Sequence, residues 1–170
     1  YWMGRILLGE IYYKRSQVSA MANDGVKTYE TQIKAIQANP YNAEYRVTYS
    51  LTNMNLAVGI LSGKEVSEEQ KQQGQVLIEQ AVREAKAATA LDSANADCWS
   101  NLAAVYQPLI GSVDGVADWI YQALTQAISL NPTDPGLKLS LGQISFGAGR
   151  YEEAERIFEE SVKVKIDLAN

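Results

Sequence analysis

A helix–turn–helix motif recurs along this chain, and this repetition constrains the fold more than any other feature. The most regular copy is LGQISFGAGRYEEAERIFEESVK at residues 141–163, preceded by Leu130-Asn131-Pro132. Less regular copies lie at residues 99–132, 78–93 and 6–40. A chain that repeats one helical hairpin buries its apolar faces by stacking each copy on the next. The sequence therefore predicts an all-α solenoid whose function lies on its surface.

Helix-starting and helix-stopping residues predict eight helices and no strand. Apolar residues at helical spacing favour a first helix over residues 2–15, and a loop is expected at 16–25. Ser67 and Gln70 have the spacing of a capping box, and Gly74 marks a weak point of the helix that follows and an alternative start for it. The other helices are expected at about 24–38, 42–61, 67–91, 95–108, 114–130, 135–146 and from 151 onward, capped by Asn23 or Asp24, Asn42, Asp114 and Asp134.

Composition excludes several classes of function. The chain has 170 residues with 15 Lys and Arg against 20 Asp and Glu, so its net charge of −5 argues against a nucleic-acid partner. Histidine is absent, which removes the commonest general base and metal ligand. The one cysteine, Cys98, cannot form an internal disulfide and is expected to be buried. No apolar run reaches the ~18–20 residues that cross a bilayer. We expect no enzymatic activity, no cofactor and no metal.

The recurring motif resembles the tetratricopeptide repeat (TPR), a 34-residue unit of two antiparallel helices, A and B. That family places large residues at positions 4, 7 and 11, small ones at 8, 20 and 27, an aromatic at 24 and proline at 32. If Pro135 is position 1, Leu141, Gly142, Ala154 and Phe158 fall at positions 7, 8, 20 and 24. The resemblance implies one right-handed superhelical TPR domain with units at about 2–42, 43–95, 96–134 and 135–168.

The three earlier units match this pattern less completely. In the third unit, helix A has large, large, small and large residues at positions 4, 7, 8 and 11. In the first unit, helix A has large, small and large residues at positions 7, 8 and 11. The second is recognisable only by small residues of its helix B. The matching residues are Trp99, Leu102, Ala103, Tyr106, Ala127 and Pro132 in the third unit, Leu8, Gly9, Tyr12, Ala35 and Pro40 in the first, and Ala81, Ala85, Ala88 and Ser93 in the second.

The spacing of the units predicts a thickened edge. From Pro40 to Ser93 is 53 residues and from Ser93 to Pro132 is 39, so these units exceed 34 residues by 19 and 5. The first unit has an excess of about 7. Each excess falls between helices A and B, so it should enlarge the edge that carries the A–B turns. Two interpretations stay open, namely tolerated loop growth and an added contact surface.

The resemblance also implies a binding groove, because TPR arrays bind peptides on the concave surface lined by A-helix positions 2, 5, 9 and 12. No Lys occurs at these positions, so recognition of a C-terminal carboxylate is not expected. The residues at these positions are mostly apolar or uncharged, so the groove suits an apolar helix or extended segment of a protein partner. The alternative is that neighbouring helices cover several of these side chains. The candidate groove residues are Ile6, Glu10, Tyr13, Val47, Leu51, Met54, Ser100, Gln107, Leu139, Gln143 and Phe146.

A second resemblance is narrower. The runs NPYNAEYRVTYSLTNMNLA at residues 39–57 and NADCWSNLAAVYQPLIG at 95–111 look like the soluble repeat region at the C-terminal end of bacterial O-antigen-ligase-like membrane proteins. The missing initiator Met and the apolar first helix fit a start just past a membrane segment. This implies a domain tethered to the cytoplasmic or extracytoplasmic face of the inner membrane. No ligase motif lies in the chain, so glycan-transfer chemistry is not carried over.

These patterns predict a non-catalytic protein–protein interaction or scaffold domain of a larger membrane-anchored glycan ligase or polymerase. One alternative is a free-standing TPR adaptor. Another is an accessory domain that binds glycan or a lipid carrier through its Tyr and Trp side chains. Such a face would require exposed aromatic residues beside carboxylates, so the exposure of Trp2, Trp99 and Trp119 discriminates between these functions.

The last helix further predicts self-association. It keeps an apolar face, and a terminal repeat normally needs a polar outer face. Either the parent protein continues beyond Asn170 or the terminal helices form a homodimer. The apolar residues of this face are Ile157, Phe158, Val162 and Val164.

Overall fold

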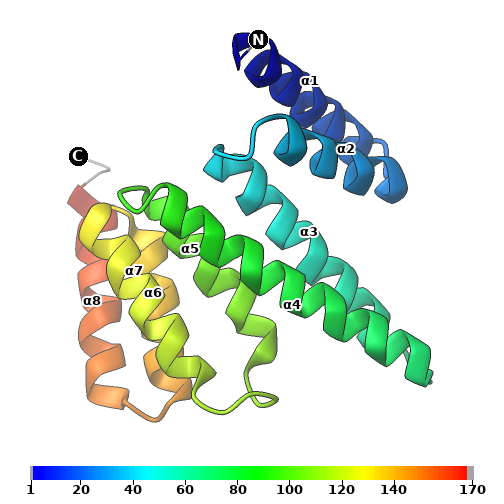
Figure 1. The fold of residues 1–170 in the computed structure, drawn as a ribbon. Helices are drawn as coiled ribbons and strands as arrows, with labels where there is room; N and C mark the ends of the chain where they lie inside the picture. Colours follow the sequence, from blue (N-terminus) through cyan, green and yellow to red (C-terminus); the bar gives the residue numbers. More distant parts are fainter. Residues whose placement is uncertain (1, 168–170) are drawn as a thin grey trace. The chain divides into compact units, whose positions relative to one another are not determined.

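The computed structural model describes residues 2–167, and within them it contains eight α-helices, one short 3-10 helix and no strand (Figure 1). The all-α prediction is therefore confirmed. The helices are α1 (Trp2–Met21), α2 (Gly25–Ala38), α3 (Ala43–Leu61), α4 (Glu68–Leu91), α5 (Ala96–Tyr106), η1 (Gln107–Leu109), α6 (Val116–Leu130), α7 (Pro135–Gly147) and α8 (Tyr151–Asp167).

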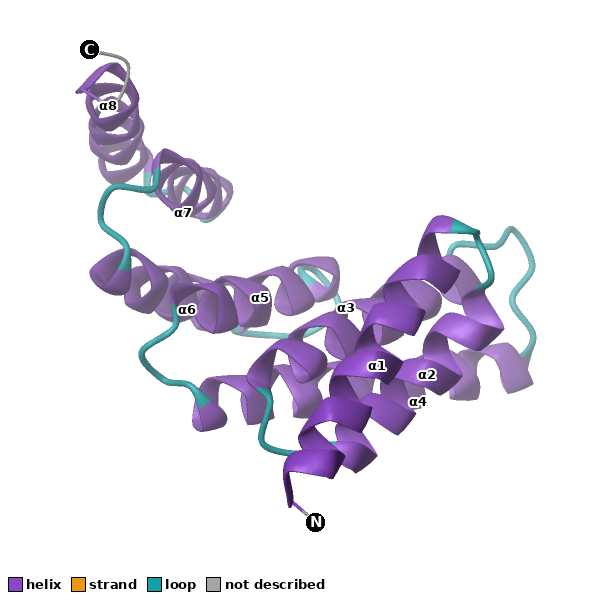
Figure 2. Cartoon of the chain, turned by 90° about the horizontal axis from the view of Figure 1, so that it is seen from above, coloured by secondary structure: helices purple, strands orange, loops and turns teal. Residues whose placement is uncertain are grey.

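The helices are organised as hairpins in two compact units, Tyr1–Leu91 and Asp92–Asn170. In the first unit α1 packs on α2 and α3 on α4, and α2 also contacts α3. In the second unit α5 packs on α6 and α7 on α8, and α6 also contacts α7 (Figure 2). Within each unit, consecutive hairpins therefore stack, as the repeated motif requires.

Most of the predicted caps are present. Asp24 and Asn42 accept hydrogen bonds from backbone N–H groups three residues onward, at 3.0 and 3.2 Å. Ser67 and Gln70 form the reciprocal capping box, with bonds of 2.9 and 3.2 Å between each side chain and the other residue's backbone N–H. Asp134 caps α7 in front of Pro135, whose missing N–H is not needed in the first helical turn.

Two boundary predictions were wrong. Residues 16–21 are helical and not a loop, because Ser16 and Ser19 are small and buried, and they extend the buried face of α1. Asp114 does not cap α6. Gly115 precedes that helix in the left-handed conformation, with φ of 74°, and no side chain bonds to the free N–H groups.

In the first and second repeat units the extra residues between helices A and B lengthen helices, whereas in the third repeat unit they form η1 and the loop before α6. The hairpin α3–α4 has helices of 19 and 24 residues, whereas α7 has 13. Gly74 does not begin α4, which starts at Glu68 and continues through the glycine. A Cβ at Gly74 would lie 2.7 Å from side-chain atoms of Leu61, so glycine lets the far ends of the two helices approach. The thickened edge of this hairpin is thus a packed helical extension.

Small residues permit close helix packing at the positions that the repeat pattern assigns to them. Gly142 lies directly under the ring of Phe158, which would overlap a Cβ at that position. Six alanines at small positions are also buried, so the paired helices approach at these points. They are Ala35, Ala81, Ala88, Ala103, Ala127 and Ala154.

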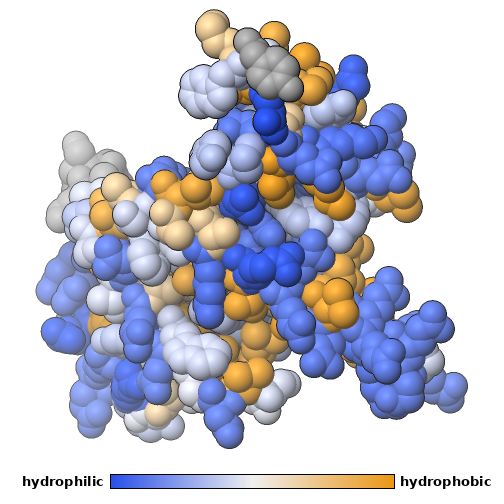
Figure 3. Space-filling model, viewed as in Figure 1, coloured by the Kyte–Doolittle hydropathy of each residue, from blue (hydrophilic) through white to orange (hydrophobic). Residues whose placement is uncertain are grey.

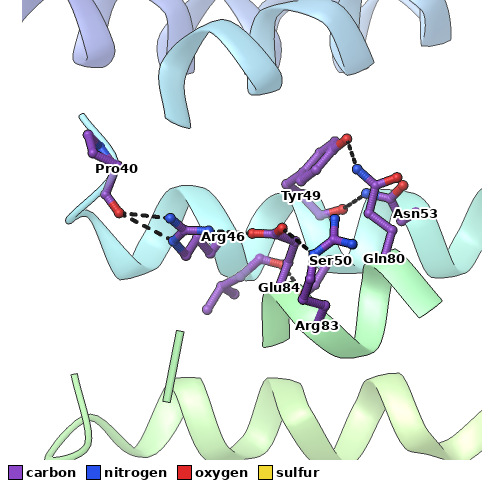
Figure 4. Close-up of polar contacts among 9 residues, drawn as sticks. Pro40, Arg46, Tyr49, Ser50, Asn53, Gln80, Arg83 and Glu84 are labelled. Atoms are coloured by element: carbon purple, nitrogen blue, oxygen red, sulfur yellow. Dashed lines mark hydrogen bonds and ion pairs between the residues drawn. The ribbon is translucent and has the colours of Figure 1, made fainter. Parts of the chain in front are cut away.

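A polar network joins α3 to α4 and to the turn before α3 (Figure 4). The Arg46 guanidinium donates to the Pro40 carbonyl at 3.0 and 3.3 Å and pairs with Glu84 of α4 at 2.5 Å. One turn further along, Gln80 donates to the Tyr49 hydroxyl. The first unit therefore depends on buried charge and hydrogen bonding as well as on apolar packing.

Candidate functional site

The groove positions of α1 lie against α3 in the first unit. Ile6 and Glu10 are half-buried, whereas Tyr13 is only 7% exposed. The Tyr13 hydroxyl is 3.0 Å from a Glu44 carboxylate oxygen and 3.0 Å from the Thr48 hydroxyl, both on α3. Tyr13 therefore fills the space between the two A helices, and it presents little surface to a partner.

A second tyrosine completes this contact from the opposite side. The Tyr45 hydroxyl donates to Glu10 at 3.0 Å, and the Tyr13 and Tyr45 rings have centroids 4.8 Å apart. Burial, followed by the hydrogen bond to Glu10, raises the pKa of Tyr45 to about 12. Burial also raises the pKa of Tyr13. Both phenols stay protonated at neutral pH, so they act as fixed hydrogen-bond partners of the two carboxylates.

The groove positions of α3 differ sharply in exposure. Leu51 is exposed and Val47 is half-buried, but Met54 is only 2% exposed and belongs to the core. The alternative interpretation, in which neighbouring helices cover some candidates, therefore describes Tyr13 and Met54. Leu51 is the candidate of this helix that offers an apolar side chain to a partner.

In the second unit the candidate residues are more accessible. Ser100 of α5 is half-buried and Gln107 is exposed. On α7, Leu139 is 47% exposed and Phe146 is 58% exposed, with Gln143 exposed between them. Residues spaced by four and three lie on one face of a helix, so these side chains form a continuous surface strip.

A hollow that the groove prediction did not include lies on α7 and α8. It has a volume of about 720 Å³ and an apolar lining from Phe146, Tyr151, Phe158 and Val162. Glu155, Glu159 and Lys163 also line it. The apolar face predicted for the last helix pointed to Phe158 and Val162. The contribution of Tyr151 depends on the turn between α7 and α8, which the helical pattern does not describe.

Comparison with known proteins identifies the fold. No protein-family model matches the sequence, and no curated protein does. The solved structure of the MamA RS-1 ArsTM double mutant has a TM-score of 0.71 at 14% identity, covering 94% of this chain and 76% of that one. TTC0263, a thermophilic TPR protein of Thermus thermophilus, has a TM-score of 0.69 at 17% identity, covering 95% and 79%. The chain has the tetratricopeptide-repeat fold.

A third TPR structure was solved with a ligand. The first TPR of Spaghetti (RPAP3), bound to the HSP90 peptide SRMEEVD, has a TM-score of 0.65 at 12% identity and covers 85% of this chain and 95% of that one.

In TPR terms, α1, α3, α5 and α7 are A helices, and α2, α4, α6 and α8 are B helices. The expected bounds of the four units and their assembly into one domain stay predictions.

The tryptophans of this TPR chain differ in role. Trp99 is half-buried, and its indole N–H donates to the Ser93 carbonyl at 2.9 Å, which ties α5 to the turn before it. Trp119 is exposed and packs against Tyr106, with ring centroids 5.5 Å apart. Trp2 is exposed on α1. Trp2 and Trp119 thus have exposed rings, which is one of the two features that the glycan-binding alternative requires.

No group of three or more His, Cys, Asp or Glu side chains among the described residues lies close enough to hold a metal ion. Cys98 is buried as expected, and burial raises the pKa of its thiol, so the reactive thiolate is disfavoured. Across residues 2–167, no helix is both long and apolar enough to cross a membrane.

Proposed function

We propose that this domain is a non-catalytic protein-interaction module that binds an apolar segment of a partner protein along its A helix α7. The observation that carries the proposal is the strip of Leu139, Gln143 and Phe146 on α7. Two large apolar side chains are exposed there on either side of a neutral one. An amphipathic helix or an extended segment can bury such a strip through a few apolar anchors.

The composition of the strip also favours one class of partner. An acidic peptide requires cations to pair with its carboxylates. The candidate groove contains none, and Glu10 adds a negative charge. The acidic peptide in the RPAP3 structure is a ligand of that protein, and the groove of this chain has different chemistry. We therefore propose an uncharged, apolar segment as the ligand.

The test uses a displayed library of random 12-residue peptides selected on the full chain. Peptides recovered on the wild-type protein should carry apolar residues at helical or alternating spacing. The double variant Leu139→Glu with Gln143→Glu should weaken their binding by about tenfold or more, equivalent to about 1.4 kcal/mol. The control is Ile110→Glu, which adds charge at an exposed apolar residue outside the groove set. Peptides that bind both variants equally, or that are mostly acidic, would contradict the proposal.

The sequence resemblance to O-antigen-ligase-like proteins supports a finer proposal, namely that the domain belongs to a membrane-anchored bacterial glycan ligase or polymerase. Reading the gene outward from the codon of Tyr1 tests this directly. A run of membrane-spanning segments upstream would support the membrane-anchored parent, and a nearby start codon would favour the free-standing adaptor.

The alternative of a glycan or lipid-carrier accessory domain has support from the exposed rings of Trp2 and Trp119. A saccharide that stacks on either ring should change tryptophan fluorescence. Titration with soluble oligosaccharides separates the two functions, because peptide binding at α7 leaves these rings free. A saturable fluorescence change lost in Trp119→Ala or Trp2→Ala would favour the glycan-binding alternative.

A further inference from the structure

The hollow on α7 and α8 occupies the place where a TPR array would receive its next A helix. Within the second unit, α7 packs on α6 and Leu124 and Ile120 of α6 are buried. The 34-residue repeat places Phe158 and Ala154 of α8 at the equivalent positions. Phe158 is only half-buried, and Val162 is 57% exposed. The hollow therefore has the apolar lining of a stacking site but is open to solvent.

The first A helix carries the complementary face. In α7, Leu137, Leu141 and Ile144 occupy unit positions 3, 7 and 10, and all three are buried in the second unit. The same positions in α1 are Gly4, Leu8 and Ile11. Leu8 is 43% exposed and Ile11 is 39% exposed.

The unit positions whose side chains are buried on α7 thus carry exposed residues on α1. Further exposed apolar residues continue this surface along the whole helix, and apolar side chains show over α1 at the top of Figure 3. They are Met3, Leu7, Val18 and Met21. Taken together, α1 has the face of an A helix that stacks on a preceding hairpin.

The charges of α1 and α8 distinguish between two ways in which these faces could pair, namely α1 with α8 and α8 with another α8. The α1 helix carries three cations and one carboxylate, whereas α8 carries six carboxylates and three cations. Lys14 and Arg15 lie between Ile11 and Val18 on α1, and the hollow is lined by Glu155, Glu159 and Lys163, which together carry a net charge of −1. Pairing α1 with α8 brings opposite charges together, whereas pairing α8 with another α8 brings like charges together.

We propose that the hollow on α7 and α8 of one molecule binds α1 of a second copy, so that the TPR stack continues from chain to chain. The contact is heterologous, because the two copies use different surfaces, and each added molecule leaves one open face of each kind. This surface differs from the proposed peptide strip. Phe146 borders both, so the variants below leave it unchanged and the two proposals can fail independently.

The experiment measures the mass of the full chain by light scattering or sedimentation from about 1 µM to about 1 mM, the range expected for a weak association. The wild-type protein should show a mass that rises with concentration beyond a dimer. One variant carries Leu8→Glu with Ile11→Glu, and the other carries Tyr151→Glu with Val162→Glu. Tyr151 and Val162 are both exposed, so the second variant should fold normally. Each variant alone should stay monomeric.

Mixing the two variants is the decisive step. Each retains the face that the other has lost, so an equimolar mixture should form a dimer and stop there. The control is Val76→Glu on α4, which changes an exposed apolar residue and should associate like the wild type. Circular dichroism checks that every variant keeps its helical content.

Three results would overturn the proposal. A wild-type chain that stays monomeric throughout would mean that these faces bind something other than a second copy. A dimer that persists in the Leu8/Ile11 variant would indicate pairing between two α8 faces. A mixture of the two variants that remains monomeric would show that the two faces do not bind each other.

Discussion

Arg46 and Glu84 form the most buried ion pair among the described residues of the first unit. Their side chains are only 19% and 10% exposed, and each has lost most of its hydration. Arg46 offsets this loss by bonding to both Glu84 and the Pro40 carbonyl, so one side chain joins α3, α4 and the turn before α3. Removing Arg46 takes away the closer partner of Glu84, which keeps only the contact with the largely exposed Arg83 at 3.3 Å, and leaves the Pro40 carbonyl without its two bonds.

We therefore expect Arg46→Ala to lower the free energy of unfolding by about 3 kcal/mol. The matched control is Lys71→Ala, which removes an ion pair with Glu68 on the exposed surface of α4 and should cost less than about 0.5 kcal/mol. Urea denaturation of both variants, followed by circular dichroism, measures the difference. Equal effects would show that the buried pair contributes no more than the surface pair.

At the scale of the element, the closeness of paired helices decides which glycines can be replaced. Gly142 of α7 lies against the Phe158 ring of α8, whereas Gly59 of α3 has no atom within 4 Å of the place of a Cβ. Both residues are helical, so alanine improves the intrinsic helix propensity at either site. Only the packing against a partner helix differs between them.

Gly59→Ala should raise the free energy of unfolding by about 0.5–1 kcal/mol, because nothing opposes the gain in helix propensity. Gly142→Ala should lower it by about 1–3 kcal/mol, because the Phe158 ring has to leave its position between the helices. Thermal or urea denaturation of the two variants gives the signs. A gain in both would mean that the ring moves aside at no cost.

At the scale of the whole molecule, the chain is divided into Tyr1–Leu91 and Asp92–Asn170. Each unit contains two hairpins that pack on each other and its own buried residues. In repeat proteins, stability is approximately a sum of contributions from each repeat and its nearest neighbours. A unit that already contains a stacked pair of hairpins therefore has the main requirements for folding.

We expect the 92–170 fragment to fold by itself, with a helical circular dichroism spectrum and a sigmoidal urea transition. The 1–91 fragment should do the same, but Arg46→Ala within it should abolish the transition, because a smaller core has less stability to lose. A featureless, disordered spectrum for the 92–170 fragment would mean that its helices require the rest of the chain.

The sequence alone determined the helical class, the pairing of helices into hairpins and most of the helix starts. These features depend on local chemistry. Asp24, Asn42 and the Ser67/Gln70 box bond to backbone groups at most three residues away, and the small positions follow from the repeat. A local pattern suffices wherever the interacting groups are close in sequence.

Only the tertiary structure decided which surface residues are open to a partner. Tyr13 and Met54 occupy groove positions in the repeat pattern, yet contacts between α1 and α3 bury Tyr13, and Met54 belongs to the core. The lengthening of α1 through Ser16 and the continuation of α4 through Gly74 likewise depend on buried contacts within the first unit. The burial of Tyr13 is set by α3 residues 31 and 35 positions away, which helical periodicity does not encode.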